Sequence, residues 1–282
     1  MAINLKALAK AITATDKIIT PAVSEWLTLH GDDALDEAVA EKIKQLLTTT
    51  PRYRGKSFSS SSAGSCIRAQ VYGYLDAPGE AVDQQLANIY IDGKWRHLRW
   101  QAMLLSIGIL TDIEYSLPWP AKRSVGTMDG LGVVPDTHPN VAWRGQEFGW
   151  ELKGVSTFQY SSVSKGEPME AHLNQVARYF LSSGLELFSI VYEDKTTQAF
   201  HEWVVQRDSA DMKARIQESA YELDHLNEAV DTRTLPQRLP ECASLRGETF
   251  RSCSYGGDSY GPCAKFNMWP KGDTFDKKRR SR

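Results

Sequence analysis

The sequence predicts an α/β (α+β) fold in which helices precede and follow a group of strands. With 282 residues, 41% of them hydrophobic, the chain can bury one good core with elements added at its ends. The spacing of apolar residues is helical up to about residue 107, strand-like between residues 112 and 154, and mixed afterwards. We therefore expect one principal domain over residues 58–265, a helical region at 1–57 before it and a basic tail at 266–282.

The first elements are expected to be helical. Segments rich in Ala, Leu and Lys predict helices up to about residue 50, with breaks near Pro21 and Gly31. The serine cluster at 57–62 favours a loop and a helix cap. Further helices are expected around Cys66–Tyr74 and over Val82–Ile107.

Three short segments then predict an antiparallel three-stranded meander, because they are rich in β-forming residues and separated by Gly and Pro: Asp112–Leu117, Ser124–Val134 and Phe148–Gly154. After the meander we expect a helix, two strands and a long charged helix: Pro168–Ser183, Leu185–Glu193, Ala199–Gln206 and Asp208–Ala229.

Charge and hydropathy exclude two classes of protein. The longest apolar stretch, Ala102–Leu110, is far shorter than the roughly 20 residues of a membrane-spanning helix, and no export signal is recognisable, so we expect a cytoplasmic protein with no membrane association. The net charge of −2 argues against a protein that coats DNA through its overall charge. The basic run Lys277–Arg282 is either a solvated chain end or an arm that binds phosphate.

The tripeptide Glu151-Leu152-Lys153 is the first candidate for chemistry. In a strand, Glu151 and Lys153 project to the same side while Leu152 points into the core. A carboxylate that holds a divalent cation, next to an ammonium group that orients water, is what phosphodiester hydrolysis requires. Surface strands also carry such pairs without any function.

A second acid is expected to join this pair. Asp129 lies in the preceding predicted strand, between Gly126 and Gly130, and pairing of the two strands would bring it close to Glu151. The alternative is an ordinary turn aspartate. Asp136 follows a proline, but its neighbours are typical of a loop, so we prefer Asp129.

Flanking helices add three side chains. His97 follows Gly93 at the helical position from which an imidazole could reach the cation, although a single helical histidine is more often a packed or surface residue. Gln175 and Tyr179 are four residues apart and share one helix face. That face could meet the cleft or be ordinary surface.

Taken in order, these motifs resemble the series of the RecB-like PD-(D/E)XK nucleases over roughly residues 60 to 265: Gly-x-x-x-His, Gly-x-x-Asp, Glu-x-Lys and Gln-x-x-x-Tyr. The resemblance implies a restriction-endonuclease-like core with a central mixed sheet flanked by helices. It also implies Mg²⁺ or Mn²⁺ bound by His97, Asp129, Glu151 and the carbonyl of Leu152. Lys153 would orient the water, while Gln175 and Tyr179 would position DNA and water.

The chain has four cysteines: Cys66, Cys242, Cys253 and Cys263. In a cytoplasmic protein they are expected to be buried thiols or metal ligands, and four thiolates suit zinc or a [4Fe-4S] cluster. No Cys-x-x-Cys pair is present, which argues against an ordinary zinc ribbon. One cysteine before the core and three after it resembles the CRISPR-associated and AddB-type iron–sulfur exonucleases, which implies a [4Fe-4S] staple between the two ends of the domain.

The resemblance implies a metal-dependent DNA exonuclease, and we expect it to prefer single strands. Tyr53, Arg54 and Lys56 could stack on bases and hold phosphates, or form a surface turn, and Arg68 is a further candidate DNA contact. No nucleotide motor is expected, since Thr50 stands where a Walker A motif needs glycine; a separate helicase or recombination protein could be a partner. The alternatives are a non-catalytic scaffold that binds DNA ends and a zinc-stabilised, structure-specific endonuclease.

Overall fold

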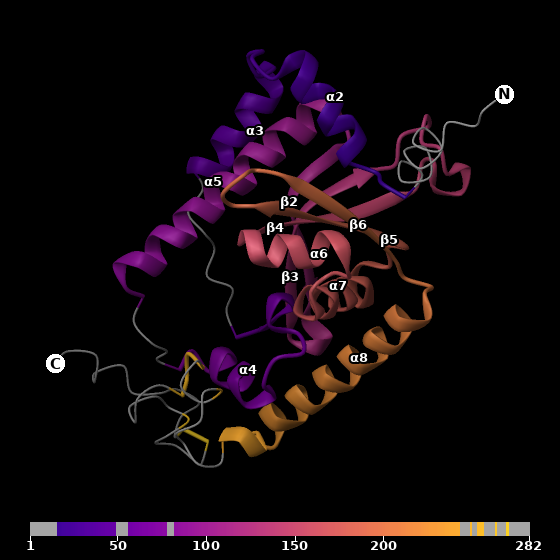
Figure 1. Cartoon of the computed structure of the whole chain (residues 1–282). Coiled ribbons are helices and arrows are strands. Elements are labelled where there is room, and N and C mark those ends of the chain that lie inside the picture. Colours follow the sequence, from indigo (N-terminus) through magenta and orange to yellow (C-terminus); the bar gives the residue numbers. More distant parts are fainter. Residues whose placement is uncertain are drawn as a thin grey trace.

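A six-stranded mixed sheet forms the centre of the protein (Figure 1), which confirms the predicted fold class. The computed structural model describes residues 16–48, 56–77, 82–242, 249, 253–256, 263 and 269–270. The strand order is β1-β3-β4-β5-β6, and β2 pairs with β3. The strands are β1 (Phe58–Ser59), β2 (Leu110–Trp119), β3 (Ser124–Val133), β4 (Glu147–Val155), β5 (Leu187–Asp194) and β6 (Phe200–Gln206).

The predicted meander is confirmed. β2 pairs antiparallel with β3, and β3 pairs antiparallel with β4. β5 then joins β4 in parallel and β6 closes the sheet antiparallel to β5. Two elements of this region were not predicted: the short β1, which pairs in parallel with β3, and helix α6 (Thr157–Lys165), whose polar sequence starts at a capping box of Ser156 and Gln159.

Helices cover both faces of the sheet. On one face, α5 (Gln84–Ile107) packs Trp100 and Leu104 against Trp150 and Leu152 of β4. On the other face lies a second cluster with residues of α7 (Glu170–Ser183) and α8 (Ala210–Asp231); Val163 of α6 belongs to it. The prediction that Leu152 points into the core is thus confirmed.

The N-terminal helices α2 (Thr20–His30) and α3 (Glu37–Thr48) lie beside α5 at one end of the molecule (Figure 1). The predicted break near Pro21 is confirmed: residues 16–19 are not helical, and this proline stands in the first turn of α2, where its missing N–H costs nothing. The backbone N–H groups of Ile18, Ile19 and Thr20 donate to the buried carboxylate of Glu202 on β6 at 2.9–3.0 Å. This carboxylate therefore fixes the start of α2 to the sheet.

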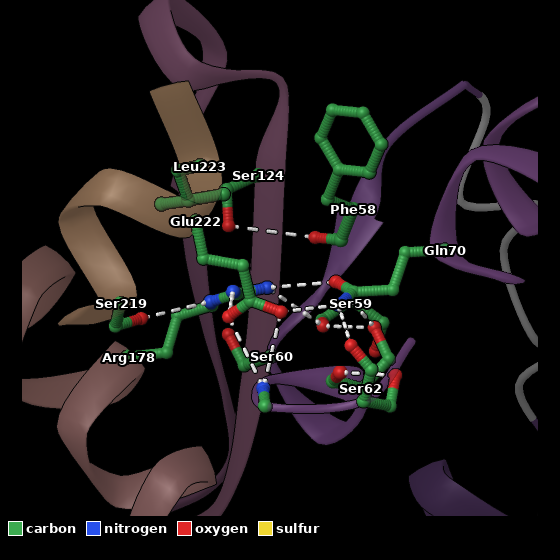
Figure 2. Close-up of polar contacts among 12 residues, drawn as sticks. Phe58, Ser59, Ser60, Ser62, Gln70, Ser124, Arg178, Ser219, Glu222 and Leu223 are labelled. Atoms are coloured by element: carbon green, nitrogen blue, oxygen red, sulfur yellow. Dashed lines mark hydrogen bonds and ion pairs between the residues drawn. The ribbon is translucent and has the colours of Figure 1, made fainter. Parts of the chain in front are cut away.

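The serine segment is held by a buried arginine (Figure 2). It contains β1 and a 3-10 turn, Ser60–Ser62, and leads to helix α4 (Ile67–Tyr74), before which Cys66 stands as the N-cap residue. Arg178 of α7 is fully buried, donates to Ser219 at 3.1 Å and forms an ion pair with Glu222, both on α8. Glu222 also accepts the Gly64 N–H at 3.1 Å. One charge pair thus joins α7 and α8 to the segment that precedes Cys66.

Among the helices that the structure describes, none is long and apolar enough to cross a membrane.

Candidate metal centre

The site lies where β3 and β4 part. Their pairing ends at Gly130 and Trp150. Beyond this point the carboxylate of Asp129, rather than the β3 backbone, accepts the Leu152 N–H, at 2.7 Å to Oδ2. The strands therefore open around a carboxylate in the middle of the sheet, which is how hard oxygen ligands can be brought together inside a folded core.

Glu151 and Lys153 project from β4 toward α7, as their alternation predicts. Lys153 Nζ is 2.8 Å from Glu151 Oε1 and 2.9 Å from Gln175 Oε1. Gln175 donates to Glu151 Oε1 at 2.9 Å and to the Tyr179 hydroxyl at 2.7 Å, and that hydroxyl donates to the carbonyl of Thr127 at 2.7 Å. The predicted face of α7 therefore does meet the two predicted strands.

Glu151 is a buried carboxylate whose pKa is raised. It is only 5% exposed, and its second oxygen, Oε2, has no hydrogen-bond partner in the described part of the chain. Burial and the nearby charge of Asp129 raise the pKa of Glu151 to about 7, although Lys153 and His97 oppose the shift. A buried carboxylate oxygen without a donor is what a cation ligand looks like before the cation binds. The residues present therefore fit a divalent cation.

His97 reaches this site from α5. Its Nδ1 lies 3.0 Å from Asp129 Oδ1. Burial acts to lower the pKa of His97, but the carboxylates of Asp129, Glu151 and Glu114 outweigh it and the pKa is raised. Four of the predicted side chains, His97, Asp129, Glu151 and Lys153, thus come together, and Asp136 lies away from them in an exposed turn.

Two residues at this site were not predicted. Ligand atoms of Glu114, His97 and Asp129 all lie within 4.8 Å of one another. Gln101 Nε2 donates to Glu114 Oε1 at 3.0 Å and to the Asp129 carbonyl at 2.9 Å. The sequence held a signal for both: Gln101 is one helical turn after His97, and Glu114 is an acid in the strand expected to pair with that of Asp129.

The two motif glycines, Gly126 and Gly93, have different surroundings. A Cβ at Gly126 would come within 2.6 Å of Ser60 Oγ and 2.7 Å of the Tyr179 ring, so only glycine lets these residues approach β3. A Cβ at Gly93 would meet nothing within 4 Å. Gly93 lies on the wall of an open cleft, where the absence of a side chain leaves room beside His97.

This cleft, of about 640 Å³, runs from the site along α5. Tyr90 and Lys94 of α5 line it, together with Lys153, Lys195 and Glu114. Tyr90 lies two helical turns before His97 on the same side of the helix, and 60% of its surface is exposed. The cleft thus offers an aromatic ring and ammonium groups next to the carboxylates.

Of the four residues predicted to contact DNA, the structure describes Lys56 and Arg68, and neither lines this cleft. Tyr53 and Arg54 are outside the described residues, and Lys56 is exposed. The assignment of Arg68 is wrong: this side chain is only 5% exposed, donates to the Tyr72 hydroxyl at 3.1 Å and to the carbonyl of Pro236 at 2.5 Å. Its guanidinium is used inside the protein and is not offered to a DNA backbone.

The four cysteines line one small, mostly apolar cavity between α4 and the chain that follows α8, and Arg68 and Tyr72 line it with them: Cys66, Cys242, Cys253 and Cys263. Burial and the three neighbouring thiols raise the pKa of Cys242. Cys242 lies 176 positions after Cys66 in the chain, yet both line this cavity. Four thiols facing one space fit a thiolate-bound metal group.

Comparison with known proteins gives only distant similarity. No family model and no curated protein matches the chain. Among solved structures it is similar to an alkaline exonuclease (LHK-Exo) from Laribacter hongkongensis, with 14% identity, a TM-score of 0.41 and coverage of 64% of this chain and 93% of the other. It is likewise similar to LHK-Exo in complex with dAMP, with 14% identity, a TM-score of 0.44 and coverage of 64% of this chain and 90% of the other. A third similar structure is that of SSO0001, with 17% identity, a TM-score of 0.37 and coverage of 65% of this chain and 83% of the other.

Proposed function

We propose that this protein is a metal-dependent DNA exonuclease of the PD-(D/E)XK type. The observation that carries the proposal is the buried Glu151, whose Oε2 lacks a partner in the described chain while Asp129 and Lys153 stand beside it. A structural ion pair would not leave one buried carboxylate oxygen unsatisfied next to a second acid. A site that holds Mg²⁺ or Mn²⁺ explains both features.

In this proposal each residue has a separate task. Asp129, Glu151, His97 and the carbonyl of Leu152 hold the cation, which when bound polarises the phosphodiester and lowers the pKa of water. Lys153, fixed by Glu151 and Gln175, donates to the attacking water or to the charge that develops on the phosphate. Gln175 and Tyr179 keep this arrangement rigid through their contacts with Glu151 and Thr127.

The cleft along α5 supports a single strand as the preferred substrate. Tyr90 presents an aromatic face on which an unpaired base can stack, and Lys94 and Lys195 can hold phosphates on either side. Stacking of this kind requires a base that is not engaged in pairing. The exposed Lys56 and the basic residues of the tail 266–282 are proposed as further phosphate contacts.

We also propose that the four cysteines hold a [4Fe-4S] cluster. The shared cavity supports a bound metal group, and the wide cysteine spacing without a Cys-x-x-Cys pair favours iron–sulfur over zinc. Such a cluster would tie Cys66, at the start of the proposed nuclease domain 58–265, to its end. Protein purified without oxygen should be brown, whereas a colourless, zinc-loaded protein would refute the cluster.

Incubation of the protein with end-labelled single-stranded DNA and Mn²⁺ tests the function. Release of labelled mononucleotides or short products from linear DNA, with closed circles left intact, is the expected result. Tight binding without cleavage would indicate the scaffold that binds DNA ends, and cutting of closed circles would indicate the structure-specific endonuclease. Lysate fractions that increase the rate on duplex ends would identify the helicase or recombination protein we propose as a partner.

A further inference from the structure

The carboxylate of Glu114, on β2, belongs to the same group of ligand atoms as His97 and Asp129. One oxygen of Glu114, one oxygen of Asp129 and a ring nitrogen of His97 lie within 4.8 Å of one another. Groups so close can share one cation, because oxygen and nitrogen ligands sit about 2.0–2.2 Å from Mg²⁺ or a similar ion.

The backbone turns Glu114 into this position. Ile113 packs in the cluster on the α5 side of the sheet, whereas Tyr115 and Leu117 pack on the α7 side, so the alternation of β2 is broken at Glu114. Its φ of 51° lies in the left-handed region, which residues other than glycine seldom adopt. An unfavourable conformation that brings an acid toward two proposed ligands is a feature of functional sites.

Gln101 then fixes the carboxylate. Its side chain is 1% exposed, and its amide nitrogen donates both to Glu114 Oε1 and to the carbonyl of Asp129. Its amide oxygen Oε1 is buried and has no hydrogen-bond partner within the described chain. Reversing the amide would place that oxygen against two acceptors, so the oxygen needs a donor that none of the described residues provides. A water in the shell of a cation at this group would be such a donor.

We infer that Glu114 is a further ligand of the divalent-cation site and that Gln101 is the residue that positions it. The inference rests on the proposed function, since it adds to the same site. It assigns to β2 a ligand that none of the four sequence motifs contains. It also gives a reason for the burial of Gln101, a polar side chain that is only 1% exposed.

Direct Mn²⁺ binding tests this without turnover. The concentration of free Mn²⁺ is followed by electron paramagnetic resonance in titrations of the wild-type protein, Glu114→Gln and Glu147→Gln. Glu147 is a matched control, because it is an exposed glutamate at the far end of β4. We expect Glu114→Gln to raise the Kd for Mn²⁺ roughly tenfold or more, and Glu147→Gln to leave it unchanged. A Kd for Glu114→Gln within twofold of the wild type overturns the inference.

A double-mutant cycle tests the positioning role. Gln101→Met should weaken Mn²⁺ binding in the wild type but have little further effect in Glu114→Gln, because the first residue acts through the second. Additive effects would overturn this role, and circular dichroism checks that each variant is folded. If the wild type cuts DNA while Glu114→Gln binds Mn²⁺ normally, the inference fails alone. If Mn²⁺ binding depends on Glu114 but no DNA is cut, the metal site stands and the nuclease function falls.

Discussion

Replacement of Glu151 by glutamine is expected to stabilise the protein in the absence of metal. The pKa of this carboxyl rises from its ordinary 4.5 to about 7 in the folded protein, mainly because it is buried and lies near Asp129. Between these values the folded state keeps a proton that the unfolded chain has lost. The free energy of unfolding of the wild type should therefore fall as pH rises from about 4.5 to about 7 and then level off.

The magnitude follows from the same two values. The carboxyl pKa rises from 4.5 in the unfolded chain to about 7 on folding. Ionisation of this group therefore lowers the free energy of unfolding by roughly 3 kcal/mol. Glu151→Gln removes this titration, so at pH 8 the variant should be more stable than the wild type by up to about 3 kcal/mol, while near pH 4.5 the two should agree. A stabilising change at the centre of a site, with loss of function, is typical of residues placed for chemistry.

The assay is urea unfolding at several pH values between 5 and 8 with a chelator present, followed by tryptophan fluorescence. Glu147→Gln, on the same strand but exposed, should run parallel to the wild type at every pH. Mg²⁺ added at pH 8 should stabilise the wild type much more than Glu151→Gln, because the variant has lost a ligand. Parallel pH profiles for the wild type and Glu151→Gln would refute the assignment of a strained, buried carboxylate.

Three further outcomes are expected. Lys153→Ala should lower the rate of DNA cleavage about a hundredfold or more while leaving Mn²⁺ binding measurable, since the ammonium group acts on water or phosphate; unchanged cleavage would move the active centre elsewhere. Tyr90→Ala should weaken binding of single-stranded DNA by roughly 1–3 kcal/mol in fluorescence anisotropy, whereas Tyr221→Ala, an equally exposed tyrosine on α8, should not; equal losses would remove the stacking site. Cys242→Ser should abolish the visible absorption of anaerobically purified protein and lower its melting temperature, and a retained brown colour would contradict the four-cysteine assignment.

Sequence patterns sufficed for elements whose side chains alternate or repeat. The meander around Asp129 and Glu151 was predictable because period-two alternation and flanking glycines survive in the structure. The order of the four motifs predicted that His97 and Gln175 contribute to one site, and they contact Asp129 and Glu151 respectively. For Glu114 the sequence signal was only its place in a predicted strand. Its positive φ breaks the alternation of that strand, and no local rule predicts a positive φ for a glutamate.

Arg68 failed for the opposite reason. Its sequence context, a basic residue on a short helix near a serine-rich loop, is equally suited to DNA and to the protein interior. The choice was made by tertiary structure, because the carbonyl of Pro236 lies 168 residues away in the chain. Local sequence therefore cannot show whether a basic side chain is exposed, because a hydrogen-bond partner far away in the sequence can bury it.

Helix α7 connects the two proposed metal groups. Gln175 contacts Glu151 and the Tyr179 hydroxyl at the proposed cation site. The neighbouring buried Arg178 contacts three other residues, Ser219, Glu222 and Gln70 (Figure 2). Gln70 belongs to α4, the helix that begins just after Cys66, so the cysteine end of the molecule and the cation site are linked by neighbouring residues of one helix. Gln70 is one of the hydrogen-bond partners of the fully buried Arg178, so loosening the cysteine end would remove one contact of this guanidinium. If α7 shifted in response, Gln175 would move away from Lys153, and in that way a purely structural metal group could affect the rate of cleavage.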